Sequence, residues 1–473
     1  MDIAWVSTVT MGMFPVSFAF ALQYAHLTTF ALHIGVSDTF SSLVWLCGPV
    51  TGLVIQPLVG QFSDICHLKI GRRRPFIILG AIALASSQLA VAFSTDIGFF
   101  FGDRGASHAV ALGVFIASFW VYDAANNVFA ISLRALLCDI VPYSRMQLAF
   151  SLQQVWSSMG YICGYYISQI RWVTIADMQF FHWSSTCPIT CAASHSAMDC
   201  PPEYVSGCFD LKVSFLLSAC ITIACAVIVC ITAREKRQHG HAPIELNLCA
   251  ALSDVPEEMH VIYLASLLSW FGWFSALVYQ VNFVTREVIK AETESQVEDA
   301  ERSAFFGLMM GSVISAVTSL CIPSITRHRI SRSFLVWSAS CGILAVILAI
   351  APLVAYTGNL NFGVIWLASF GVVYAVTNSI PYSLLSLMVN EHKESLSAGK
   401  AMGLLNVAVC IPQIITSVLG GPVISQFHSD IPCFIIGAMC AAAACAVLRD
   451  KVNQLRQGYT RAPDDIPSIH SVQ

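Results

Sequence analysis

The chain of 473 residues is far more apolar than a soluble protein, because 56% of its residues are hydrophobic and only 11% are charged. Soluble globular domains average about 25% charged residues. The composition therefore predicts an integral membrane protein and excludes an ordinary soluble domain. The net charge of −4 and the lack of a basic arm give no reason to expect nucleic acid as a partner.

About twelve apolar segments follow one another, each long enough to cross a bilayer as a helix. They lie at 9–35, 41–62, 76–96, 109–138, 147–170, 211–233, 259–283, 303–325, 333–354, 362–388, 401–426 and 431–448. The first begins almost at Met1 without the basic region and cleavage site of a signal peptide, so we expect it to remain as a span. We predict an all-α membrane protein with about twelve transmembrane helices.

The distribution of Lys and Arg predicts the orientation in the membrane. With both termini in the cytoplasm, seventeen Lys and Arg residues fall on the cytoplasmic face and six on the other face, and Arg134 is left within its helix. This bias satisfies the positive-inside rule, which the reversed orientation would violate. We therefore expect an even number of spans and two cytoplasmic termini.

Asp123 lies near the middle of the fourth apolar segment. A carboxylate at a helix centre costs roughly 2.5 to 3.5 kcal/mol on insertion, so we expect it to face a polar cavity and not lipid. Asn126, Asn127 and Arg134 share its side of the helix. Arg134 is roughly 16 Å away along the helix axis, which is too far for an ion pair. We interpret Asp123 as the proton-carrying group beside a polar substrate, and Arg134 as a charge that serves the cytoplasmic end.

Amides and aromatic rings on the first and fifth segments are further candidates for substrate contacts. A neutral polyhydroxyl ligand needs many hydrogen bonds and flat apolar faces for stacking. The predicted substrate-binding residues are Gln23, Asn126, Asn127, Gln153, Gln154 and Trp156. Contacts between helices are the alternative role of such side chains. A sodium site would need more hard oxygen ligands, so Asp123 favours a proton, and we expect neither a metal nor a cofactor.

Segments one to six and seven to twelve carry similar features in the same order, which predicts two related six-helix halves. Transporters built from such repeats bind substrate at the midplane between them. The predicted divisions are an N-terminal half at 1–233, a cytoplasmic central loop at 234–258, a C-terminal half at 259–448 and a cytoplasmic tail at 449–473.

In the second half, we expect an aromatic wall at Trp270–Phe274, a polar outer gate at Tyr279–Asn282 and a solvated loop between Glu292 and Arg302.

The charged loop after the second segment is interpreted as a cytoplasmic gate. Its residues are Gly60, Asp64, Gly71, Arg72, Arg73 and Arg74. Carboxylates and guanidinium groups form charge-assisted contacts that can hold neighbouring helix ends in one conformation. A simple positive-inside anchor is the alternative. Asp139, at the end of the fourth segment, is grouped with Arg134 as a charge that transport requires.

Four of the 18 cysteines, Cys187, Cys191, Cys200 and Cys208, share one polar loop on the non-cytoplasmic side. In an oxidising compartment disulfides are expected there, with three pairings open to four residues. A zinc cluster is the alternative, but the nearby His195 lacks the spacing of a ligand.

Several motifs occur in one order along nearly all of the spans. They are Val44–Pro49, Gln56–Gly60, Gly71–Phe76, Asp123–Asn127, Arg134–Leu137, Arg286–Val288, Ser379–Pro381 and Ile411–Gln413. Together they resemble the sucrose–proton symporter family of plants, within the glycoside–pentoside–hexuronide:cation branch of the major facilitator superfamily. The resemblance implies the major facilitator fold of two six-helix halves. It also implies proton-coupled sugar uptake, with Asp123 as the protonation site and Arg134 required for transport.

The chain departs from that family at several positions. Gln280 and Asn282 stand where plant members carry acids, and Asp38 stands where they carry a histidine linked to sugar access. These differences leave the identity of the sugar open. We expect a functional monomer in the plasma membrane, with a vacuolar or other organellar membrane as the alternative.

The predicted function is a proton-coupled symporter of sucrose or a related disaccharide or glucoside that works by alternating access. The sequence has no His-Glu-x-x-His, phosphate-binding loop or serine elbow, so we do not expect an enzyme. One alternative is a transporter of another small neutral or amphipathic solute on the same fold. The other is a non-transporting sugar sensor, although such sensors often have an enlarged central loop or tail.

Overall fold

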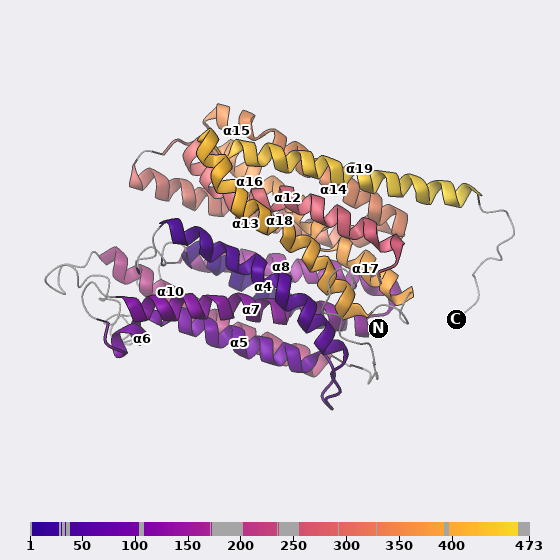
Figure 1. Cartoon of the computed structure of the whole chain (residues 1–473), viewed down its shortest axis with the longest axis horizontal. Helices are drawn as coiled ribbons and strands as arrows, with labels where there is room; N and C mark the ends of the chain where they lie inside the picture. The colour runs from indigo at the N-terminus through magenta and orange to yellow at the C-terminus, as the bar shows by residue number, and fades with distance from the viewer. Residues whose placement is uncertain are drawn as a thin grey trace.

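The structure is a computed structural model, and every regular element in the residues it describes is a helix. The described residues are 2–27, 30, 34, 38–103, 108–170, 172, 202–233, 235, 255–291, 293–327, 329–391 and 397–461. Figure 1 shows the helices running side by side along one elongated bundle. The all-α prediction is confirmed.

The helices account for about twelve spans. Those before residue 233 are α1 (Ile3–Thr10), α2 (Met13–Leu22), η1 (Gln23–Leu27), α4 (Asp38–Asp64), α5 (Arg74–Ala92), α6 (Ser94–Phe100), α7 (Ala109–Ile140), η2 (Tyr143–Arg145), α8 (Met146–Ser168) and α10 (Pro202–Thr232). Those after residue 255 are α12 (Glu257–Phe283), η4 (Val284–Val288), α13 (Glu294–Thr326), α14 (Ile330–Ala349), α15 (Ala351–Thr357), α16 (Leu360–Thr377), α17 (Ile380–Glu391), α18 (Ala398–Phe427) and α19 (Ile431–Arg461).

Among the described residues, ten helical stretches are long and apolar enough to cross a membrane. The 27-residue α4 and the 23-residue α8 bring the total to twelve, as the sequence predicted. The last helix, α19, continues well beyond the predicted end of its span at residue 448.

Polar side chains distinguish α8 from the other long helices. Gln147, Gln153 and Gln154 of α8 are all buried. Amides are tolerated at membrane depth only where they face protein or water. α8 accordingly lies inside the bundle, packed against α2 and α13.

The two halves form two layers that meet along the middle of the molecule. In Figure 1 the helices from α4 to α10, in indigo to magenta, lie below those from α12 to α19, in red to yellow. Across this boundary α4 packs on α18, and α8 packs on α13. The end of the bundle that holds α17 and the loop of Arg72 and Arg73 is called the basic end below. α6 and α15 lie at the opposite end.

The first span is made of three pieces instead of one regular helix. It starts at Ile3, earlier than predicted, and is interrupted before Met13. A side chain on Gly12 would lie 2.7 Å from a methyl group of Leu133, so glycine lets α2 approach α7 closely there. After α2 the helix widens into the π-helical turn η1, which begins at Gln23. Such turns are frequent at functional sites.

The predicted loop between Glu292 and Arg302 is wrong over most of its length, because α13 begins at Glu294. Thr293 and Gln296 form a capping box, in which each side chain accepts a hydrogen bond from the backbone N–H of the other residue. This pattern satisfies two backbone groups at the helix start, so acidic and polar residues extend the helix beyond the apolar segment.

Candidate functional site

Asp123 lies at the centre of α7 with only 1% of its surface exposed. A side chain on Gly48 of α4 would come within 3.5 Å of its carboxylate. Gln23 of η1 and Cys47 of α4 also lie beside it. Within the described part of the chain, neither carboxylate oxygen has a hydrogen-bond partner of standard distance and angle, although the Gln23 and Cys47 side chains lie close enough to interact with it. A buried carboxyl group with two unused oxygens needs a proton or a ligand, because an unpaired buried charge is costly.

Three of the predicted substrate residues are buried amides with unused polar atoms. Gln23, Asn126 and Gln153 are 4%, 1% and 6% exposed. Among the described residues, the side-chain oxygen of each has no hydrogen-bond partner, and the same is true of the Asn126 amide nitrogen. Buried polar groups are nearly always paired in folded proteins. These amides are therefore available to a polar ligand or to water.

Asn127 is engaged with the neighbouring helix α4. Its amide nitrogen donates to Thr51 Oγ1 at 3.1 Å and to the Asp123 carbonyl at 2.9 Å. Its oxygen accepts from Gln56 Nε2 at 2.6 Å. Asn127 would have to leave these partners before it could bind a substrate, so the structure favours the helix-contact alternative in this conformation.

Gln154 and Trp156 also have protein partners. Gln154 Nε2 donates to Ser315 Oγ at 3.3 Å, across the boundary to α13. The indole N–H of Trp156 donates to the Ser7 carbonyl at 2.9 Å, within the first half. Neither residue therefore joins the amides with unused polar atoms, and Trp156 points its polar group toward α1.

An aromatic cluster connects Asp123 with the second half. Tyr161 of α8 meets Tyr374 of α16 edge to face with ring centroids 5.7 Å apart, and Tyr374 stacks on Trp273 of α12 at 5.2 Å. Tyr24 of η1 lies within electrostatic range of both Asp123 and Tyr374. Sugar rings present apolar faces that stack on such side chains. Trp273 belongs to the predicted aromatic wall, whereas Tyr374 was not predicted.

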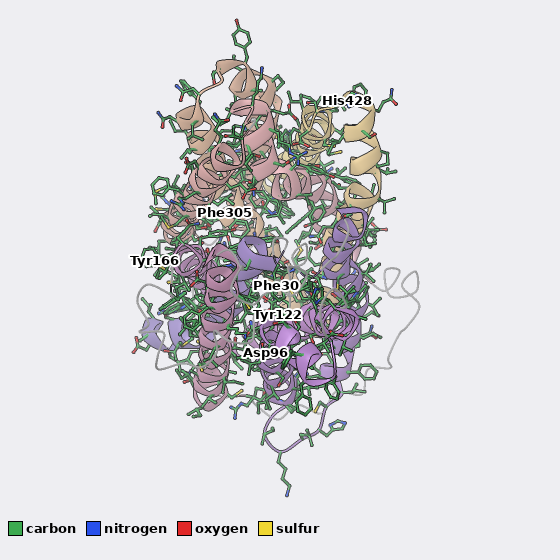
Figure 2. The ribbon with its side chains drawn as sticks, turned by 90° about the vertical axis from the view of Figure 1, so that its left-hand side faces the viewer. Phe30, Asp96, Tyr122, Tyr166, Phe305 and His428 are labelled. Carbon is green, nitrogen blue, oxygen red and sulfur yellow. The ribbon has the colours of Figure 1, made fainter. Side chains whose placement is uncertain are left out.

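A second aromatic region lies between α8 and α13 at the opposite end of the bundle. Tyr166 and Phe305 appear in Figure 2 where the two layers meet, and Tyr122, next to Asp123 in the chain, appears among the first-half helices. The rings of Tyr165 and Phe305 are 6.0 Å apart. They border a cavity of about 240 Å³. The halves therefore also touch at this end.

The basic end is closed by close packing of α4 on α18. A side chain on Gly60 would clash with the backbone of Gly399, so the two helices approach as closely as their backbones allow. Nearer the centre of the bundle, the Asn406 amide of α18 donates to the Gly52 carbonyl at 2.9 Å. These contacts block passage between α4 and α18 from the basic end.

Buried charges join α4 and α7 at the basic end. Arg73 is fully buried and pairs with Asp64 and with Asp139, the second at 2.8 Å. Arg72 Nε also donates to Asp139 Oδ2 at 2.9 Å. Burial alone would lower the pKa of Arg73, but the carboxylates of Asp139 and Asp64 hold it above its ordinary value. Arg73 therefore stays charged and holds the two helix ends together.

This charge network extends into the second half through Ser397. The Ser397 hydroxyl donates to Asp64 Oδ2 at 2.6 Å. Ser397 is also the N-cap of α18 and accepts from the Lys400 backbone N–H at 3.3 Å. Asp64 therefore links the first half directly to the start of α18.

The remaining residues of the predicted gate lie beside Glu235, which follows α10. Gly71 has a φ of 120°, and a side chain there would clash with the Glu235 carboxylate. The Arg73 backbone N–H donates to the same carboxylate at 2.9 Å. Arg74 is 3.8 Å from it and partly exposed. Glycine at position 71 therefore supplies both a left-handed turn and the space for this contact.

Arg134 lies at the boundary between the halves. Its guanidinium carbon is 4.2 Å from the centroid of the Tyr382 ring of α17. Among the described residues it forms no ion pair, with Asp123 or with any other carboxylate. The charge is thus balanced by an aromatic face contributed by the second half.

Asp430, which the sequence did not single out, lies in a polar corner at the opposite end with Asn282 of the predicted outer gate. It is 2% exposed, and Asn282 Nδ2 donates to its Oδ2 at 3.0 Å. Its backbone N–H donates to Glu287, which also accepts from the Ser429 hydroxyl at 2.8 Å. Burial and the Glu287 carboxylate raise the pKa of Asp430 to about 6, although Asn282 and Arg286 act in the other direction.

The polar corner predicts a pH dependence of stability. The folded-state pKa of Asp430 is about 6, above the value of about 3.9 in an unfolded chain. The stabilising contribution of the protonated group is therefore complete below about pH 4 and is lost as the pH rises through 6. We expect Asp430→Asn to flatten this part of the profile of unfolding temperature against pH. The exposed Asp299→Asn serves as the control and should leave the profile unchanged.

Cys208 is disulfide-bonded. Cys187, Cys191 and Cys200 lie outside the described residues, so the pairing among the four loop cysteines remains a prediction. Within the described residues, no group of three or more His, Cys, Asp or Glu side chains is arranged to hold a metal ion.

Comparisons with known proteins identify the family of this chain. A family model described as Major Facilitator Superfamily matches residues 9–415. The sucrose transport protein SUC4 of Arabidopsis thaliana is 30% identical over 464 residues, covering 92% of this chain and 86% of that protein. The sucrose transport protein SUT2 of Oryza sativa subsp. japonica is 28% identical over 487 residues, covering 94% of this chain and 93% of the relative.

Solved structures show the same fold. The major facilitator transporter FucP in its outward conformation superposes with a TM-score of 0.63 at 14% identity, covering 95% of this chain and 98% of that one. The proton:xylose symporter XylE superposes with a TM-score of 0.59 at 12% identity. Similarity at this level of identity concerns the fold alone. From the family model and the relatives together, the chain belongs to the major facilitator superfamily and, within it, to the family of plant-type sucrose transport proteins.

Proposed function

We propose that this protein is a symporter that carries sucrose or a related glucoside together with a proton. Its relatives are sugar transporters and not enzymes. The observation that carries the proposal is Asp123, a buried acid at membrane depth whose two oxygens have no hydrogen-bond partner among the described residues. An ionisable group so placed in a membrane span is functional by default, because its burial is costly.

Alternating access gives each group a role. The basic end, which we assign to the cytoplasm, is closed by the packing of Gly60 against Gly399, so this conformation blocks release of the sugar to that side. In this state Asp123 takes up a proton, and the sugar binds the unpaired amides of Asn126 and Gln153. The halves then close around the sugar and part at the basic end. Asp123 releases its proton to the cytoplasm after the sugar has left.

The other parts of the proposal follow from this assignment. Both termini and the central loop at 234–258 lie in the cytoplasm, on the side where the positive-inside rule places the arginine cluster. The halves at 1–233 and 259–448 are the two moving units. Each monomer carries a complete pathway and works in the plasma membrane.

Uptake of radiolabelled sucrose into cells that express the protein tests the proposal. Uptake should be faster at pH 5 than at pH 7.5 and should collapse when a protonophore is added. An uptake rate that changes neither with pH nor with the protonophore would contradict proton coupling. No sucrose uptake despite verified surface expression would contradict the cargo, and the same assay with maltose and plant glucosides would then identify the sugar.

A further inference from the structure

Tyr382 is a second-half residue seated against two side chains of the first half. The Arg134 guanidinium of α7 lies 4.2 Å from its ring centroid, and the Phe150 ring of α8 stacks with it at 6.2 Å. Tyr382 is 3% exposed, so its ring is buried at this boundary. One turn further along both helices, Ser386 Oγ donates to Cys138 Sγ at 3.1 Å.

The contact has a regular geometry. Arg134 and Cys138 are four residues apart on α7, and Tyr382 and Ser386 are four residues apart on α17, so each pair lies on one helix face. The two pairs therefore form two contacts, one helical turn apart, between α7 of the first half and α17 of the second half. If α7 and α17 separate, both contacts must break together.

The ring of Tyr382 is also the group that balances the Arg134 charge. Within the described residues Arg134 has no carboxylate partner. A cation inside a membrane span is costly unless a partner compensates it, and an aromatic face attracts a guanidinium group most strongly where water is excluded. Losing the ring would therefore remove the aromatic partner of the half-buried Arg134 in the closed bundle.

We propose that Tyr382 is a positioning residue that holds Arg134 only while the basic end is closed. The inference rests on the proposed transport function, because alternating access requires the halves to part at this end. When the halves part, Tyr382 moves away with α17, and the Arg134 guanidinium group then faces the space that opens. The contact thus stabilises the closed basic end, and the Arg134 charge becomes exposed only when that end opens.

Distances across the basic end test this inference. Spin labels at Ser144 and Arg327, which are exposed and belong to different halves, report its opening. Tyr382→Leu should shift the ratio of open to closed states by about fivefold, the size of one cation–π contact. Tyr382→Phe, which keeps the ring, should retain the wild-type distances. Tyr382→Met replaces the leucine variant if that variant does not fold.

A second arm separates the cation–π contact from ordinary packing. In an Arg134→Gln background, Tyr382→Leu should cause no further opening. An equal shift in both backgrounds, or no shift in either, would overturn the inference. The distances are measured without sugar or a proton gradient. A failure to transport sucrose would therefore count against the proposed function and leave this test intact.

Discussion

Asp123→Asn is expected to abolish accumulation of sugar against a gradient. One proton moved through 100 mV supplies about 2.3 kcal/mol, which corresponds to about a 50-fold concentration ratio. An amide cannot carry the proton, so the ratio should fall to about 1. The measurement is the steady-state ratio of radiolabelled sucrose in membrane vesicles with an imposed potential and pH gradient.

Exchange provides the control for Asp123→Asn. The amide keeps the volume of the buried carboxyl group and its capacity for hydrogen bonds, so exchange of labelled for unlabelled sugar should persist without a gradient. Asp123→Glu retains an acid and should retain some accumulation. Full accumulation by Asp123→Asn would show that another group carries the proton.

The fold was predictable because the signal for a membrane helix is local. About twenty consecutive apolar residues suffice to predict a span, and the twelve predicted segments correspond to the helices of the structure. The prediction was wrong where polar residues extend a helix beyond its apolar part. At the start of α13 the capping pattern of Thr293 and Gln296 was readable in the sequence, but its residues were assigned to a loop by polarity alone.

The candidate site was predictable only in part. Asp123 is conspicuous because acids are rare inside apolar spans. The roles of its neighbours could not be predicted, because Asn126 and Asn127 both lie on the same broad side of the helix. In the structure Asn127 bonds to α4, whereas Asn126 has no hydrogen-bond partner among the described residues. A helical periodicity cannot distinguish a neighbouring helix from a cavity.

Partners from the second half left no local signal. Tyr374 and Tyr382 both lie in the apolar segment 362–388, and nothing in that segment indicates which first-half residues they meet. Ser397 contacts Asp64 from 333 residues away. The arginine cluster in the sequence predicted a charged latch. The residue that links this latch to α18 is Ser397, and only the folded structure shows that it lies beside Asp64.

The latch gives the second large expected effect. Arg73→Gln should destabilise the protein strongly, because it removes the one cation that is fully buried between Asp64 and Asp139. Breaking a buried pair by removing one partner costs about 3 to 5 kcal/mol, since the remaining charge is left uncompensated. The measurement is the midpoint of thermal unfolding in detergent. Arg74→Gln is the matched control, because Arg74 is partly exposed and 3.8 Å from Glu235.

The cause of that loss can be isolated with a second substitution. If the uncompensated carboxylate dominates, adding Asp64→Asn to Arg73→Gln should restore part of the unfolding temperature, although the protein then has one polar contact fewer. Asp139 keeps Arg72 as a partner at 2.9 Å, so one cation still balances it. Equal losses in Arg73→Gln and Arg74→Gln would contradict this account. They would mean that the cluster acts as a positive anchor at the membrane surface, and that closure of the basic end depends on the packing of Gly60 against Gly399.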